Sequence, residues 1–427
     1  MYQEHFHTVL ERTQKALEHC GYDQLIIHSG SPVPAFLDDQ SYPYRANPHF
    51  LYWVPLTNFP DSFVVVSTSE KPKLVLLQPI DFWHTAKDVP EGAWLELFDI
   101  ISVATLDEAE RLLCAKANTA WIGDTPAMAT RWGYESSINP PALLNYLHYD
   151  RAYKTEWEIE QLTQANRMAG IAHTAARDAY LSGASEIEIH LAYLTSIKQC
   201  ETELPYSSIV ALNEHGAILH YDQYQRKAPD AHRAFLIDAG ARVNGYVADI
   251  TRTWTTDDDF QTVIDAIDRA QLELIEEFRI GEDYASYHYA MHHRLAIILA
   301  EHKLINCSPE SAVDNGITKA FFPHGLGHLI GLQTHDIGGH QLDRSGTIAD
   351  TNDGHPFLRL RRKLEANTAI TVEPGCYVIP ELLKPFAGSS ELNWDRIEWL
   401  RQFGGVRIED TVVVTTDGPK NLTRPFV

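Results

Sequence analysis

Two aspartates flank a turn signal in the segment 235–254, F-L-I-D-A-G-A-R-V-N-G-Y-V-A-D-I-T-R-T-W. Apolar and β-branched runs on either side of Asn244-Gly245 predict a hairpin. With a four-residue loop over 242–245, Asp238 lies directly opposite Asp249, and both carboxylates leave one face of the sheet. Directly opposed like charges are destabilising, so the pair predicts a bound metal ion. The alternative is that each aspartate serves turn chemistry or a solvated surface.

Two histidines, His324 and His328, lie four residues apart in P-H-G-L-G-H. This spacing would place both on one helix face, as in zinc proteases, but the two glycines weaken a helix and the glutamate of H-E-x-x-H is missing. We therefore expect a turn that presents one or both imidazoles. The alternative is two unrelated surface histidines in a chain that has 21.

Two glutamates complete the candidate set. Glu373 is followed by Pro374-Gly375, which holds it in an extended conformation at the end of a strand, and Glu409 alternates with Arg407 in a run with apolar neighbours. Each alone is typical of an exposed strand residue. Together with the two aspartates and His328, they supply four carboxylates and one imidazole.

This set of side chains has specific chemistry. It exceeds what one tetrahedral zinc ion accepts, and its many oxygens favour a harder ion such as Mn²⁺. Four carboxylates balance two divalent cations. Like charges ~4 Å apart repel by roughly 4 kcal/mol at an effective dielectric constant of about 20, so the cluster requires cations or protons.

Five motifs, one around each of these residues, resemble the metal-binding motifs of the "pita-bread" peptidases: D-A-G (Asp238), A-D-I-T-R-T-W (Asp249), H-G-L-G-H (His328), V-E-P-G (Glu373) and R-I-E-D (Glu409). The resemblance is closest to the prolidase (Xaa-Pro dipeptidase) family, in the bacterial branch that includes organophosphorus acid anhydrolase. It extends over nearly the whole chain, through F-L-D-D, D-F-W-H, Y-K-T-E and I-V-A-L-N-E-H.

The resemblance implies a two-metal dipeptidase. Two divalent ions, expected to be Mn²⁺, would be held by the five ligands, with Asp249 and Glu409 bridging. A metal-bound hydroxide would attack the carbonyl before proline in an Xaa-Pro dipeptide, while Glu373 handles the proton and His324 and His335 stabilise the transition state. Organophosphorus esters and fluorides, which mimic the tetrahedral state, would be side substrates.

The resemblance also implies where the substrate binds. Four residues would line its site, with Arg407 a candidate for the dipeptide carboxylate: Tyr206, His220, Tyr284 and Arg407. For each of the four the alternative is an ordinary strand or helix residue. Asp39 and Trp83 are expected to reach the site of a partner subunit in a homodimer.

The elements that hold these residues predict an α+β chain of two domains. Residues 1–150 alternate helical and strand patterns, such as the helix 7–20, the strand 24–28 and the hairpin strands 63–66 and 73–77. They form a smaller α/β domain with a dimer and substrate-capping role. Residues 151–427 form the catalytic pita-bread (creatinase/aminopeptidase-like) domain.

The second domain shows helix and strand signals in a repeated order. Capping boxes begin helices at Thr155 and Ser185, and the strand 209–212 and the hairpin follow. Helices over 260–278 and 284–302 precede the strands 369–373 and 406–414. Helix pairs followed by strand pairs, twice, predict two similar halves.

Composition excludes several classes of partner. The formal charge of -23 disfavours nucleic acid and anionic membranes. Five scattered cysteines without a C-x-x-C pair, and a start without a signal sequence, predict a cytoplasmic protein with reduced thiols. Two alternatives to the dipeptidase are a different enzyme on this fold, like the metal-independent creatinase, and a non-catalytic binding module. The complete ligand set argues against the first, and the second would be expected to have lost ligands, whereas none is lost here.

Overall fold

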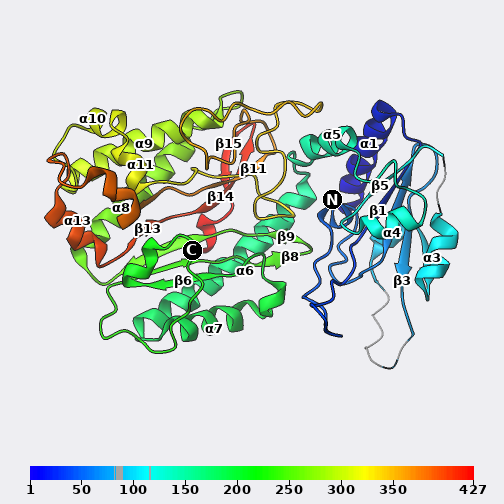
Figure 1. Cartoon of the computed structure of the whole chain (residues 1–427), viewed down its shortest axis with the longest axis horizontal. Coiled ribbons are helices and arrows are strands. Elements are labelled where there is room, and N and C mark those ends of the chain that lie inside the picture. The colour runs from blue at the N-terminus through cyan, green and yellow to red at the C-terminus, as the bar shows by residue number, and fades with distance from the viewer. Residues whose placement is uncertain (81, 83–89, 115–116) are drawn as a thin grey trace. The chain divides into compact units, whose positions relative to one another are not determined.

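The computed structural model describes residues 1–80, 82, 90–114 and 117–427, which form two compact units (Figure 1). Unit 1 comprises Met1–Arg151, Thr155–Glu158 and Asp343–Thr347; unit 2 comprises Ala152–Lys154, Ile159–Leu342 and Ile348–Val427. Within these residues, no helix combines the length and the apolar character needed to cross a bilayer.

Unit 1 contains a five-stranded mixed sheet in the order β4-β3-β2-β1-β5. The predicted hairpin is confirmed as β2–β3, and β1 pairs antiparallel with β2 and parallel with β5. Helices α3 and α4 contribute Leu113 and Met128 to a core around Phe63 and Trp121. The elements are α1 Tyr2–Cys20, β1 Gln24–His28, α2 Pro48–Leu51, β2 Phe63–Ser67, β3 Lys73–Leu77, β4 Asp99–Val103, α3 Leu106–Leu113, β5 Thr119–Ile122, α4 Pro126–Arg131 and α5 Pro141–Arg151.

Helices α6 and α7 and a three-stranded sheet form the first core of unit 2. Both predicted capping boxes form: the Glu158 carboxylate accepts from the Thr155 backbone N–H at 2.9 Å, and Glu188 accepts from Ser185 at 2.8 Å. The sheet has the order β10-β7-β6. The elements are α6 Glu156–Leu181, α7 Glu186–Ile197, β6 Ile209–Leu212, β7 Ala234–Asp238, β8 Arg242–Val243, β9 Tyr246–Val247 and β10 Thr251–Thr255.

A second core lies between helices α8 to α11 and the sheet β11-β14-β15. Figure 1 shows α6 and α7 beside β6, and α8, α9 and α11 grouped separately within unit 2. The elements are α8 Asp258–Glu276, α9 Tyr284–Glu301, α10 Pro309–Asp314, α11 Ile317–Phe321, β11 Ala369–Val372, β12 Gly375–Tyr377, α12 Pro380–Leu383, α13 Trp394–Arg401, β13 Gly405–Arg407, β14 Asp410–Thr415 and β15 Gly418–Asn421. Each half of unit 2 thus has its own helices and sheet.

The hairpin around Asn244-Gly245 is present, but its predicted register is wrong by two residues. The loop has two residues rather than four, because Asn244 (φ 50°) and Gly245 (φ 92°) both adopt the positive φ of a tight hairpin turn. Val243 therefore pairs with Tyr246, and Asp238 lies opposite Thr251 instead of Asp249. A shift of two residues preserves the face of a strand, so the two carboxylates still meet.

Candidate metal centre and substrate pocket

The two aspartates share one hydrogen-bond donor. Asp238 ends β7 and Asp249 lies just before β10. The Tyr206 hydroxyl lies 2.7 Å from Asp238 Oδ1 and also contacts Asp249 Oδ1. A single hydroxyl proton bonds to one acceptor at a time, so this contact leaves part of the negative charge of the pair uncompensated.

His328 directs one ring nitrogen at three carboxylates. The segment after α11 is irregular, with bends at His324 and Leu326, and is not a helix, as expected. His328 lies directly before a backbone bridge between Leu329 and Ile370. His328 Nδ1 donates to the Leu329 carbonyl at 2.9 Å, so in the neutral ring Nε2 carries the lone pair. That atom lies 3.4 Å from Asp249, 3.9 Å from Glu373 and 3.8 Å from Glu409.

Glu409 lies at a break between two strands. The predicted run 406–414 divides into β13, which pairs with β12, and β14, which pairs with β11. Glu409 Oε2 accepts from the Thr251 hydroxyl at 2.8 Å. Its other oxygen, Oε1, is buried and has no hydrogen-bond partner in the described part of the chain, which is the environment expected of an atom reserved for a cation.

The pKa values of the cluster reflect this crowding. Burial, together with the charge of Asp249, raises the pKa of Asp238 to about 6 and that of Glu373 to about 7, and it raises that of Glu409 well above its usual range. Burial also acts on Asp249, but the hydrogen bond and charge of His328 lower its pKa. Without cations the cluster takes up protons, which divalent metal ions would displace. The donor set therefore fits a metal centre.

The cluster opens into a cavity of about 300 Å³. All five predicted ligands line it, and so do four other predicted site residues: His220, His324, His335 and Arg407. The volume suits a small ligand. A small molecule in this cavity would contact the carboxylates directly.

Comparisons with known proteins identify this arrangement. Residues 160–416 match the model of metallopeptidase family M24, and residues 1–149 match the N-terminal domain of Xaa-Pro dipeptidase. The chain belongs to metallopeptidase family M24. It is 44% identical to the Xaa-Pro dipeptidase of Pseudoalteromonas translucida, over 99% of this chain and 98% of the relative. It is 42% identical to that of Escherichia coli, over the same shares of the two chains. The resemblance to prolidases is confirmed, and this M24 member is a metallopeptidase.

Solved structures of bacterial aminopeptidases share its fold. Aminopeptidase P from Escherichia coli, in complex with the inhibitor Pro-Leu, superposes with a TM-score of 0.75 at 22% identity, covering 98% of this chain and 95% of that one. Proline aminopeptidase P II from Yersinia pestis has a TM-score of 0.74 at 23% identity, covering 98% and 96%. The predicted fold class, an α/β domain followed by a pita-bread domain, is confirmed.

His324 lies in a chain of hydrogen bonds beside the five predicted ligands. Its Nδ1 donates to the Gly325 carbonyl at 2.9 Å, so Nε2 accepts from the Tyr377 hydroxyl at 2.8 Å. Arg407 Nη1 donates to that hydroxyl at 3.1 Å. Burial, followed by the charge of Arg407, lowers the pKa of His324 to about 3. The neutral ring places Nδ1 3.5 Å from Glu373 Oε2.

The other predicted site residues occupy different positions. His335 is exposed, and its ring lies 4.6 Å from that of His328. Tyr284 is fully buried and donates to the Thr371 carbonyl at 3.0 Å, outside the cavity lining. Asp39 is an exposed loop residue of unit 1, and Trp83 lies outside the described residues. Tyr284 therefore supports β11, the strand that contains Thr371. Its predicted contact with substrate stays a prediction.

Six residues of the cavity lining were not predicted as site residues, and two of them, Phe357 and Arg359, come from a segment that the sequence analysis did not single out. Both are exposed and lie in an irregular segment between α11 and β11, where no periodicity marks them. Among the described residues, the Arg359 side chain forms no hydrogen bond or ion pair. Arg407, in contrast, is buried and donates to Asp238 at 2.9 Å as well as to Tyr377. An exposed arginine, Arg359, and an aromatic ring, Phe357, in the lining of an acidic cavity can be recognised only from the fold.

Proposed function

We propose that this M24 metallopeptidase hydrolyses Xaa-Pro dipeptides with two divalent cations, most suitably Mn²⁺. The observation that carries the proposal is the convergence of four carboxylates and one imidazole on a dipeptide-sized cavity. The Xaa-Pro dipeptidases that match over 99% of the chain support the substrate class. Two such cations polarise a carbonyl and activate a water molecule.

The chain's own residues would bind the dipeptide and move its protons. Arg359, with its exposed guanidinium, is the stronger candidate for the dipeptide carboxylate, because three N–H groups of Arg407 already serve Asp238, Tyr377 and Thr251. His335 would donate to the carbonyl oxygen as charge develops. His324 would do the same once its single N–H turns from the Gly325 carbonyl toward the substrate. Glu373, next to His324, would take the proton of the attacking water and pass it to the proline nitrogen.

Removal of metal tests the proposal. Treatment with a chelator should lower hydrolysis of Ala-Pro at least about 100-fold, because loss of several kcal/mol of transition-state stabilisation corresponds to such a factor. Mn²⁺ should restore the activity, and Ala-Ala should be a poor substrate throughout. Activity that survives complete metal removal would favour a creatinase-like enzyme, and inactivity with every divalent metal would favour a binding module.

Substitution of Arg359 by methionine tests the carboxylate contact. An arginine–carboxylate hydrogen bond contributes roughly 1.5–3 kcal/mol, so KM for Ala-Pro should rise about 10- to 100-fold with little change in kcat. The amidated dipeptide, which lacks the carboxylate, should be hydrolysed equally by both forms. Arg279→Met, at an arginine outside the cavity lining, is the control. An unchanged KM would indicate that Arg407, and not Arg359, binds the dipeptide carboxylate.

We also propose finer properties that follow from this assignment. Exposed apolar residues of unit 1 would form a homodimer contact: Phe36 and Leu37 in the loop of Asp39, together with Ile80 and Phe82. Five free cysteines suit the reducing cytoplasm.

Hydrolysis of organophosphorus esters would use the same centre, because a tetrahedral phosphorus resembles the tetrahedral state of peptide hydrolysis. Light scattering and a p-nitrophenyl phosphotriester assay test the dimer and the side activity.

A further inference from the structure

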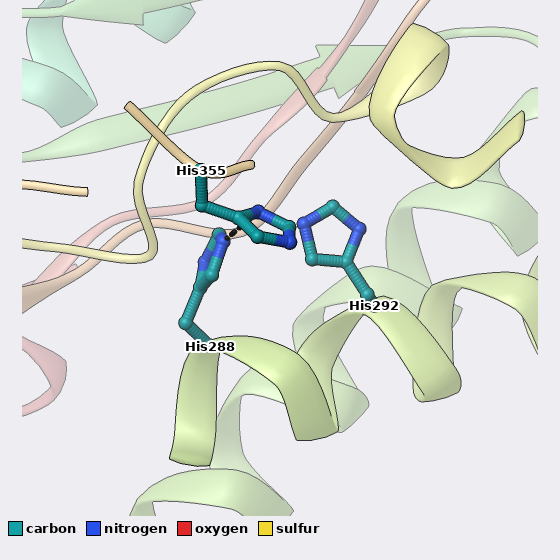
Figure 2. A group of neighbouring side chains, drawn as sticks. All are labelled: His288, His292 and His355. Carbon is teal, nitrogen blue, oxygen red and sulfur yellow. Dashed lines mark hydrogen bonds between the residues drawn. The ribbon is translucent and has the colours of Figure 1, made fainter. Parts of the chain in front are cut away.

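Three histidines gather in unit 2 outside the cavity lining: His288, His292 and His355 (Figure 2). One ring nitrogen of each lies within 4.8 Å of the other two. His288 and His292 are four residues apart on α9 and share one face of the helix. Figure 2 shows His355 facing both rings from a separate segment. The cluster thus joins two parts of the chain far apart in sequence.

The cluster is separate from the carboxylate centre but close to its pocket. The Phe322 ring packs against His292, with centroids 5.1 Å apart, and against His324, with centroids 4.8 Å apart. One aromatic ring therefore contacts both groups. None of the three histidines is among the five predicted ligands or in the cavity lining, so the proposed dipeptidase chemistry does not use the cluster.

Two ring nitrogens of the cluster lack partners although they are buried. His288 is 1% exposed and His292 is 3% exposed. In the part of the chain that the structure describes, His288 Nδ1 and His292 Nε2 have no hydrogen-bond partner. The remaining nitrogens are used: His288 Nε2 lies 2.7 Å from His355 Nδ1, and His292 Nδ1 lies 3.1 Å from the Thr318 hydroxyl. In Figure 2 a nitrogen of His292 points at the His355 ring. Buried polar atoms without a partner are rare in native proteins.

The surroundings keep these rings in the form that binds metals. Burial is the main cause that lowers the pKa of His292 to about 3 and that of His288 further, so both rings are neutral at pH 7. Among nearby charges, Lys319 opposes a cation and Asp353 favours one, although Asp353 is also paired with Arg361 at 2.6 Å. The neutral imidazoles therefore provide the attraction for a metal ion.

We propose that His288, His292 and His355 form a third metal site, which takes zinc. Three imidazoles with a fourth position for water match a ligand set of this ion, whereas the carboxylate centre suits harder ions such as Mn²⁺. Binding replaces the hydrogen bond between His288 and His355 by one bond from each ring to the ion, and it gives His292 Nε2 a partner. The alternative is a cluster of histidines that only packs and forms hydrogen bonds.

Zinc stoichiometry tests the site without reference to activity. The full-length chain is stripped with a chelator, loaded with Zn²⁺, desalted and analysed for metal. Wild type should hold one more zinc ion per chain than His292→Gln, because both share the carboxylate centre. In His292→Gln, the zinc affinity of the three-histidine site should fall more than about 100-fold, since even the loss of an outer-shell partner lowers metal affinity by 10- to 100-fold.

Two further variants make the result decisive. His293→Gln, at an exposed neighbour on the same helix, should keep the wild-type stoichiometry. His355→Phe, at a half-buried loop position, should lose one zinc ion even if His292→Gln fails to fold, and circular dichroism checks each fold. Equal zinc content in wild type and a folded His355→Phe protein would overturn the proposal.

Discussion

Asparagine at position 249 is expected to lower the turnover of Ala-Pro at least about 10⁴-fold, since the loss of roughly 5.5 kcal/mol of transition-state stabilisation from a metal centre gives this factor. Asp249 lies 3.4 Å from His328 Nε2 and shares the Tyr206 hydroxyl with Asp238. Its carboxylate therefore lies next to His328 and also shares a hydrogen-bond donor with Asp238. The asparagine has similar volume and keeps one oxygen, but it removes the charge that would bridge two cations.

Metal content and thermal unfolding separate this effect from misfolding. Mn²⁺ should raise the midpoint of thermal unfolding of the wild type, because a ligand stabilises the state that binds it, and should leave that of Asp249→Asn nearly unchanged. Asp230→Asn, at an exposed aspartate of the same unit, should behave like the wild type. If the Asp249→Asn protein bound two Mn²⁺ ions and kept its turnover, the bridging role would be wrong.

The sequence predicts much of the centre because each ligand lies at a recognisable break in a local pattern. Asp238 and Asp249 interrupt apolar runs, and Glu373 precedes a proline. The hairpin register could not be predicted as reliably, because Val-Asn-Gly fits both a two-residue and a four-residue loop. Only the φ angles of Asn244 and Gly245 decide between them. The error left the site prediction intact, since a shift of two residues keeps both carboxylates on one face.

Residues that depend on tertiary structure were not predictable in this way. Arg359 lines the cavity from an irregular segment, and His355 meets His288 of α9 across 67 residues of sequence. The pair His288 and His292 had a local signal, since H-x-x-x-H on a helix places two imidazoles side by side. That signal was hidden among 21 histidines. Spacing alone does not tell which histidines are buried without partners.

A buried ion network behind the centre holds Glu409 in place. Arg252 Nη1 donates to the carbonyls of Thr251 and Glu409, each at 2.8 Å, and Nη2 donates to Asp410 at 2.6 Å. Asp410 is completely buried and also accepts from Arg424 at 2.5 Å. Burial opposes the charge of Asp410, but the two arginines lower its pKa. Arg252 thereby ties the strand after Asp249 to the backbone of Glu409.

Substitution of Arg252 by methionine should lower the free energy of unfolding by about 3 kcal/mol, at the lower end of the range for breaking a buried ion pair, because Arg424 still compensates Asp410. The affinity for Mn²⁺ should also fall about 10- to 100-fold, since Glu409 loses its support. Urea denaturation of the metal-free protein and metal titration measure the two effects separately.

Arg294→Met provides the matched control for this prediction. Arg294 also pairs with a carboxylate, Glu277, at 2.7 Å, but this glutamate is 55% exposed. Loss of this exposed ion pair should therefore change the free energy of unfolding by less than about 1 kcal/mol and leave Mn²⁺ affinity unaltered. If both variants were equally stable and bound Mn²⁺ like the wild type, burial would not distinguish the two ion pairs, and Glu409 would be held by its Thr251 contacts alone.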